Sequence, residues 1–262
     1  MNPDSRPPRL VIAAAVAAAL LFLLPFLGLL WRMPWSSAWD LLSAPESRDA
    51  FRLSLITSIG ATVLVVALGM PLAWLLARTT FPGRRLVRGL VVLPMVLPPV
   101  VGGIALLYAF GRRGIVGRYL DSWFGITLPF STAGAVIAAA FVAMPFFVIT
   151  VEAALRSADP RFEDAARTLR ADRWTRFRRV TLPLIRPAVI AGTVLAWARA
   201  LGEFGATITF AGNFPGRTQT LPLAAFVALE TDPEAAVALA LVLVVASVAV
   251  IVALRDRWLG SL

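Results

Sequence analysis

The chain has 262 residues, of which 59% are hydrophobic and 15% are charged, and its mean hydropathy is +0.80. Soluble domains are about 45–50% apolar, so this composition indicates a protein that lies in a lipid bilayer. The sequence contains no Cys and no His, and all 25 basic residues are Arg, which excludes Cys/His zinc sites, Ser-His-Asp triads and a Walker A loop.

Runs of roughly 20 apolar residues can cross a bilayer as helices. Six segments approach or exceed this length, and we predict spans over residues 10–31, 53–77, 89–111, 133–151, 187–210 and 235–254. The first run is longer than the roughly 7–15 apolar residues of a signal peptide and further spans follow it, so we expect a retained helix. The fold class predicted is an all-α integral membrane protein with about six transmembrane helices.

The net charge of +10 can indicate either nucleic acid or a membrane partner, and the positions of the arginines favour the membrane. If the N-terminus is inside, 17 arginines fall in inner segments and 7 in outer loops. Inner loops of membrane proteins carry an excess of positive residues. We therefore expect both termini in the cytoplasm, contact with membrane lipid and no nucleic-acid partner.

The third predicted span contains the run LPMVLPPVVGG at residues 93–103. Membrane helices tolerate Pro and Gly where neighbouring groups satisfy the freed backbone. We expect a kinked or broken helix here, which serves either as a packing kink or as a gate.

The longest hydrophilic stretch, residues 152–186, separates the fourth and fifth predicted spans. Asp159 followed by Pro160 predicts a helix start, because the carboxylate caps the first turn and Pro suits the first position. An apolar stripe then follows at spacings of three, four and seven residues: Phe162, Ala165, Ala166 and Leu169. The periodicity alone fits a helix on the membrane surface or a helix docked into a cytoplasmic partner.

The same stretch resembles the cytoplasmic EAA motif of importer permeases of the ATP-binding cassette (ABC) class. That motif reads EAA, three residues, Gly, nine residues and Ile-x-Leu-Pro; here residues 164–166 read DAA and residues 180–183 read VTLP, with the same spacing. Arg170 stands at the Gly position, so we expect the turn after Leu169 to be built differently. The resemblance implies a segment that couples to a separate ATPase through Asp164, Ala165, Ala166, Leu169, Arg170, Ala171, Leu182 and Pro183.

The fifth predicted span carries Arg199 and Glu203, which are four residues apart and therefore share a helix face. Ionisable residues inside a membrane are costly, and this pair is either an internal ion pair or part of a pathway. Thr207, Thr209 and Asn213 add neutral polar groups. Such groups suit a tetrahedral dianion in transit, because conduction requires weak sites. These five residues are the candidates for a pathway or gate.

Residues 200–205, which read ALGEFG, and the loop 216–236 resemble molybdate permeases, and sulfate permeases share the first of these segments. The resemblance covers about residues 51–254. It implies the type I ABC importer permease fold (MetI-like), with an N-terminal helix and outer loop over residues 1–50 and a transmembrane domain over residues 51–255 that includes the coupling loop 157–183.

The same resemblance implies a set of partners in the cytoplasmic (inner) membrane. They are two copies of an ABC ATPase subunit that binds ATP, a periplasmic or lipid-anchored oxyanion-binding protein and a second permease chain, identical or not. No catalytic residue, metal or cofactor is expected on this chain. Tungstate and sulfate remain alternative cargoes.

Two other classes of protein fit the sequence less well. Secondary transporters also contain broken helices, but the halves of this chain show no clear repeat and Glu203 is the one carboxylate expected inside the spans. A membrane enzyme would have to work without His, Cys or Lys.

Overall fold

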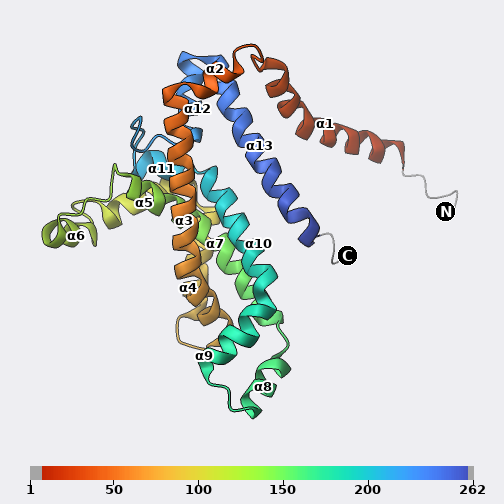
Figure 1. Ribbon diagram of the computed structural model, residues 1–262, viewed down its shortest axis with the longest axis vertical. Helices are drawn as coiled ribbons and strands as arrows, with labels where there is room; N and C mark the ends of the chain where they lie inside the picture. The colour runs from red at the N-terminus through yellow and green to blue at the C-terminus, as the bar shows by residue number, and fades with distance from the viewer. Residues whose placement is uncertain (1–7, 259–262) are drawn as a thin grey trace.

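The computed structural model describes residues 8–258, with side-chain surroundings through residue 252. This part of the chain forms thirteen α-helices and one π-helix (Figure 1). Five helical segments in it are long and apolar enough to cross a membrane: Arg9–Arg32 (α1), Pro45–Arg78 (α3), Thr132–Ser157 (α7), Arg173–Leu201 and Pro233–Val252. Arg6 and the side chains of Arg255 and Arg257, which we count among the inner arginines, lie outside the described residues.

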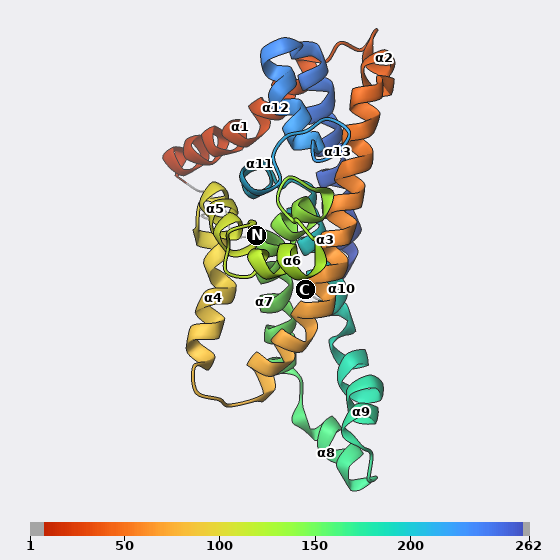
Figure 2. The same ribbon diagram turned by 90° about the vertical axis from the view of Figure 1, so that its left-hand side faces the viewer.

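The core is the seam between α3, α7 and α10 (Leu182–Leu201), which lie side by side along the long axis of the molecule (Figures 1 and 2). Phe147 of α7 is fully buried at this seam. Gly69 and Gly192 lie against its ring, and a Cβ at these positions would come within 2.8 Å and 3.3 Å of it. Such close packing through small residues holds membrane helices together, because lipid tails are as apolar as the side chains.

The third predicted span is a broken helix, which confirms the expectation drawn from its prolines. α4 (Arg84–Val96) and α5 (Pro99–Phe110) are separate helices, with Leu97 in extended conformation between them. Pro98 lacks an N–H and disfavours a helical conformation at the residue before it, so the helix stops here. The broken pair and the five long segments together stand where six spans were predicted.

The fifth predicted span is placed wrongly at both ends. Its helix begins earlier, at Arg173, and ends at Leu201; a short helix, α11 (Gly205–Phe210), follows after a break. Glu203 lies in that break and not on a helix face. Its carboxylate accepts the N–H of Ala206 at 2.8 Å, a bond that would not form if the first helix continued.

The remaining helices lie around this core. α13 (Pro233–Trp258) packs against α12 (Leu221–Thr231), α2 (Ala38–Ser43) and α1, and α6 (Gly117–Phe124) contacts α5. At one end of the molecule are α2 and α12, and at the other are α8 (Pro160–Thr168) and α9 (Arg173–Arg176) (Figures 1 and 2). α3 has 34 residues, so at 1.5 Å per residue it exceeds the roughly 30 Å of a bilayer core.

Candidate functional site

The predicted coupling segment forms the tip of the molecule around α8. The helix begins where the sequence predicts: Asp159 caps it by accepting the N–H of Arg161 at 2.9 Å, and Pro160 is its first residue. Asp172 caps α9 in the same way, with the N–H of Thr175 at 3.1 Å. Hydrogen bonds from Thr175, first its side chain and then its backbone, lower the pKa of Asp172 below its usual value. This cap therefore stays ionised at neutral pH.

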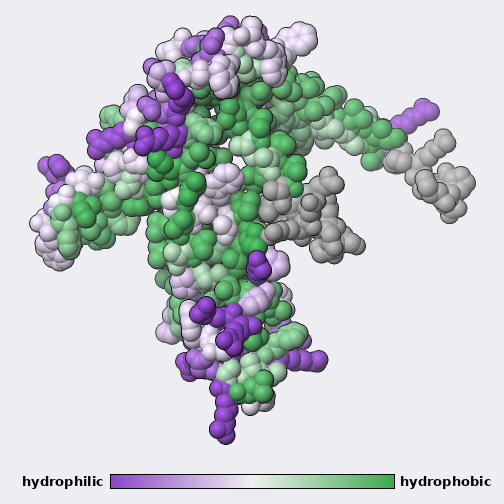
Figure 3. Space-filling model, in the orientation of Figure 1, coloured by the Kyte–Doolittle hydropathy of each residue, from purple (hydrophilic) through white to green (hydrophobic). Residues whose placement is uncertain are grey.

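The apolar stripe of α8 is largely exposed. Phe162 is 56% exposed and Leu169 is 82% exposed, and Trp174 of α9 adds a third side chain that is 62% exposed. Ala165 is exposed between them and Ala166 is half-buried. Figure 3 shows hydrophobic surface at this tip with charged residues around it. Apolar surface on a projecting helix with a polar rim is typical of a site for a partner.

Arg170 ends α8 with a left-handed backbone, at a φ of 56°. The N–H of Ala171 donates to the carbonyl of Ala166 at 3.1 Å, and the N–H of Arg170 donates to Arg167 at 2.9 Å. These two bonds make the Schellman helix end that Gly most often forms. The expectation of a different turn after Leu169 is therefore wrong: Arg170 adopts the conformation that the Gly of the motif would adopt.

Glu163 ties α8 to the membrane-spanning helices. Its Oε1 accepts hydrogen bonds from Nη2 of Arg78 at 3.0 Å and from Oγ1 of Thr181 at 2.9 Å. Arg78 is the last residue of α3, and the buried Thr181 ends the π-helix η1 (Phe177–Thr181). The sequence analysis missed this anchor, because no local pattern links two residues that are 85 positions apart.

Asp164, the residue after this anchor, points the other way. Its side chain is 60% exposed and pairs with Arg167 on the same helix at 2.8 Å. α8 therefore holds an inward carboxylate at Glu163 and an outward one at Asp164, and the outward one lies beside the exposed stripe.

Leu182 and Pro183 lie at the junction between η1 and α10. The N–H of Leu182 donates to the carbonyl of Phe177, five residues back, which widens the helix into a π turn. Pro183 lacks the N–H that would bond to the residue four positions before it. Such π turns often occur at functional sites. The Thr181–Glu163 bond brings this junction next to α8, so the structure brings together both halves of the motif.

Arg199 and Glu203 form an ion pair, although Glu203 lies in the break and not on the helix face that their spacing predicted. Nη1 of Arg199 lies 2.7 Å from Oε2 of Glu203, and the two side chains are 27% and 1% exposed. Oε2 accepts no hydrogen bond of good geometry, so this contact is an ion pair alone. Oε1 accepts the N–H of Ala206. The pair thus joins the end of α10 to the start of α11.

The three neutral candidates lie on or just after α11. Thr207 is buried, with 1% exposure. The hydroxyl of Thr209 donates to the carbonyl of Gly205 at 2.9 Å and lies 3.4 Å from the carbonyl of Val100 on α5. Asn213 is half-buried, and its Oδ1 has no hydrogen-bond partner among the described residues. In a single chain, Thr209 is therefore engaged in the contact between α5 and α11.

Residues 66–261 match the protein family described as "Binding-protein-dependent transport system inner membrane component". The chain is 48% identical over 257 residues to the "Molybdenum transport system permease protein ModB" of Mycobacterium tuberculosis, covering 98% of this chain and 97% of that protein. It is 40% identical over 232 residues to the "Sulfate transport system permease protein CysT" of Salmonella typhimurium, covering 87% and 83% of the two chains.

Among solved structures, the fold is similar to a chain of a bacterial alginate ABC transporter in complex with an alginate pentasaccharide-bound periplasmic protein. The TM-score is 0.74 at 19% sequence identity, over 95% of this chain and 94% of that chain. At this identity the similarity concerns the fold.

Proposed function

Because the chain belongs to the family of binding-protein-dependent transport system inner membrane components, we propose that it is the permease subunit of an ATP-driven molybdate importer. The 48% identity to a molybdenum permease over almost the whole chain is the observation that carries the choice of anion. Identity to the sulfate permease is lower, at 40%. The chain has no Lys for a Walker A loop, so ATP is bound and hydrolysed on a partner subunit.

The coupling segment docks into a groove of this ATPase subunit. The exposed side chains of Phe162 and Leu169 supply apolar contact, and the small side chains of Ala165 and Ala166 let the partner approach the helix closely. Asp164 and the surrounding arginines orient the docked helix. When the ATPase moves, the Glu163 anchor transmits the displacement of α8 to α3 and, through Thr181, to α10.

The end of the molecule that carries α8 lies in the cytoplasm of a multi-pass protein of the inner membrane, and both termini lie on that side. The excess of arginine in the segments at this end supports the orientation. The opposite end, with α2 and α12, faces the oxyanion-binding protein that delivers the cargo. Two permease chains and two ATPase subunits form one complete transporter.

The translocation pathway runs between the two permease chains, past the junctions where helices break. The candidate residues lie at the end of α10, in the break, and on or just after α11: Arg199, Glu203, Thr207, Thr209 and Asn213. The charge of Arg199 is compensated by Glu203, so the region presents no isolated cation that would hold a dianion tightly. Asn213 adds an amide whose Oδ1 has no hydrogen-bond partner among the described residues.

Uptake of labelled anions tests the cargo. The complete complex, with its ATPase and binding protein, is reconstituted into vesicles and supplied with labelled molybdate and ATP. We expect ATP-dependent accumulation of molybdate that excess tungstate inhibits and excess sulfate inhibits far less, because molybdate and tungstate are nearly isosteric. Preferential sulfate uptake would assign the chain to the sulfate branch, and uptake driven by an ion gradient without ATP would assign it to the secondary transporters.

A further inference from the structure

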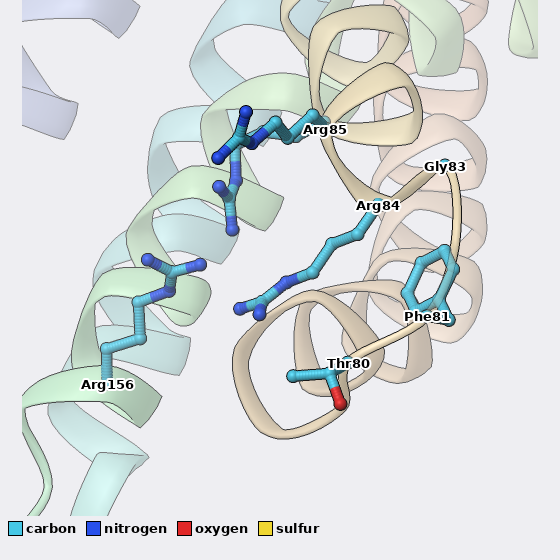
Figure 4. A pocket seen from close by; sticks show the side chains of 7 residues that line it. Thr80, Phe81, Gly83, Arg84, Arg85 and Arg156 are labelled. Carbon is cyan, nitrogen blue, oxygen red and sulfur yellow. The ribbon is translucent and has the colours of Figure 1, made fainter.

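An arginine-rich pocket of about 460 Å³ lies where α4 begins, at the α8 end of the bundle. Its walls come from the loop after α3, the first turns of α4 and the end of α7: Thr80, Phe81, Gly83, Arg84, Arg85, Arg88 and Arg156. Figure 4 shows the side chains of Arg84 and Arg156 reaching toward each other from opposite sides of this arginine pocket.

The positive charge of the arginine pocket exceeds its negative charge. Glu152 of α7 is the carboxylate that faces it; its Oε1 lies 2.5 Å from Nη2 of Arg88 and 2.8 Å from Nη2 of Arg156. Arg84 is held by the backbone instead, and its Nε donates to the carbonyl of Leu76 at 3.0 Å. Nη2 atoms of Arg84, Arg88 and Arg156 also donate to this carbonyl of Leu76. A guanidinium carries five N–H donors, so more than half of the donors of the four arginines still have no partner among the described residues.

Arg85 is the arginine of the pocket with the fewest ion pairs and hydrogen bonds. Its side chain is exposed and forms no ion pair or hydrogen bond with the described residues. Removing it therefore changes the charge of the pocket without breaking a contact of the protein.

Two of the arginines lie at the start of α4, where positive charge is electrostatically unfavourable unless an anion balances it. Arg84 and Arg85 are the first two residues of the helix, which has no acidic residue in its first turn and no side-chain cap. The start of a helix carries partial positive charge and is stabilised by anions, so adjacent cations raise its electrostatic energy. An anion bound here would relieve both the cluster and the helix end.

A separate apolar groove of about 230 Å³ lies further along α4, on the seam between α4 and α7. Its lining residues are Val87, Leu90, Val91, Pro94, Phe141 and Met144. Val87 and Val91 lie one turn from Arg84 and Arg88 on the same side of α4. The seam thus presents positive charge at the end of the bundle and an apolar groove toward its middle.

We propose that this seam binds an anionic phospholipid, with its phosphate in the arginine pocket and one acyl chain in the apolar groove. Basic pockets between membrane helices on the cytoplasmic side suit lipid head groups. A free tetrahedral oxyanion, including the proposed cargo, shares the chemistry of the phosphate but would leave the apolar groove unused. This proposal rests on the cytoplasmic orientation of this end of the molecule and does not depend on which anion the transporter carries.

Native mass spectrometry of the purified complex tests the lipid directly, with phosphatidylglycerol and phosphatidylcholine of identical acyl chains as probes. We expect wild-type protein to retain phosphatidylglycerol in preference to phosphatidylcholine. Arg85→Gln should weaken phosphatidylglycerol binding roughly fivefold, the loss expected for one basic residue at an anionic surface. Arg186→Gln, an exposed arginine at the same end of the bundle and outside the pocket, should leave binding unchanged.

A second pair of variants tests the apolar groove. Leu90→Trp fills the groove from a position that is 57% exposed and should reduce phosphatidylglycerol binding. Leu86→Trp is the matched control on the same helix, 67% exposed and outside the groove, and should have no effect. Equal binding of the two lipids, or equal effects of a variant and its control, would overturn the proposal. Saturable binding of inorganic phosphate that depends on Arg85 and not on Leu90 would overturn it in favour of a free oxyanion.

Discussion

Arg199 and Glu203 form an ion pair whose two members differ in how deeply they are buried. Glu203 is 1% exposed at the break between two helices, whereas Arg199 is 27% exposed. A fully buried charge that loses its partner is costly, and a long side chain that is only partly buried loses less. The two charges are therefore not equivalent for stability, although they neutralise each other.

Arg199→Gln should destabilise the protein more than Glu203→Gln. The first change leaves a buried carboxylate whose Oε2 accepts no hydrogen bond, and a loss of about 2–3 kcal/mol is expected. The second keeps an acceptor for the N–H of Ala206 and leaves an arginine that is only partly buried. Thermal unfolding of both variants and of the double variant measures the difference. A greater loss in Glu203→Gln would contradict this description of the pair.

Arg170 carries backbone strain that Gly would not carry. A left-handed conformation costs an L-residue about 1–2 kcal/mol, and Gly avoids this cost. The greater flexibility of Gly in the unfolded chain offsets roughly half of the resulting stabilisation. Arg170→Gly should therefore stabilise the end of α8 by about 0.5–1 kcal/mol. Amide hydrogen exchange over residues 160–171 reports the change as slower exchange.

The control for this variant is Arg167→Gly, which removes the same side chain from a right-handed position of α8, together with its ion pair to Asp164. Exchange should become faster there, because Gly in a helix interior costs about 1 kcal/mol. If both variants speed exchange equally, the turn at Arg170 is not strained.

At the scale of elements, α8 can act as a lever because three structural elements meet at one carboxylate. Glu163 joins α8 to the end of α3 and to η1, while the exposed face of α8 stays free for a partner. The side chains of Arg78 and Glu163 are 24% and 21% exposed, so this ion pair is partly buried. The anchor therefore both holds α8 against the bundle and can transmit its motion to α3.

Glu163→Gln should lower ATP-driven uptake several-fold while the complex still assembles and hydrolyses ATP. The amide is neutral and holds Arg78 less firmly, so movement of α8 reaches α3 less completely. Uptake and hydrolysis rates in vesicles measure the effect. Normal uptake in Glu163→Gln would exclude the anchor from coupling.

The close contact between α5 and α11 requires a glycine at position 103. A Cβ on Gly103 would lie 1.7 Å from Oγ1 of Thr209 and 2.8 Å from the carbonyl oxygen of Ala206. A Cβ on the neighbouring Gly102 would lie 3.1 Å from the ring of Phe141, which can shift. The two adjacent glycines therefore form a matched pair.

Gly103→Ala should lower the free energy of unfolding by about 1–3 kcal/mol, because the two backbones must move apart. Gly102→Ala should cost much less. Thermal unfolding of the two variants in the same detergent makes the comparison, and equal unfolding temperatures would show that α5 and α11 are not packed this closely.

For the whole molecule, the apolar runs could be predicted from the sequence because a bilayer requires them, and the start of α8 could be predicted because a cap and a proline are local signals. The ends of the fifth span could not be predicted. Its termination depends on a hydrogen bond between Glu203 and Ala206 that forms only when the helix stops. Hydropathy alone cannot distinguish a continuous helix from two helices with a polar residue between them.

Contacts between residues far apart in the sequence could not be predicted either, because no local pattern connects them. Glu163 meets Arg78 across 85 positions, and Glu152 meets Arg88 across 64 positions. Neither pair has a periodic pattern. The motif located the coupling segment, but the anchor that connects it to α3 and the arginine pocket beside α4 became visible only in three dimensions.

The role proposed for α8 is to couple ATP hydrolysis on a partner subunit to transport through this chain. The most direct test measures molybdate uptake and ATP hydrolysis side by side in vesicles that contain the complete complex, with Ala165→Trp as the variant. We expect hydrolysis to continue and uptake to stop, because the bulky side chain blocks close docking of the exposed face of α8. Ala17→Trp on the exposed α1 should retain both activities. Wild-type uptake in Ala165→Trp, or uptake with an inactive ATPase, would contradict the coupling role of α8.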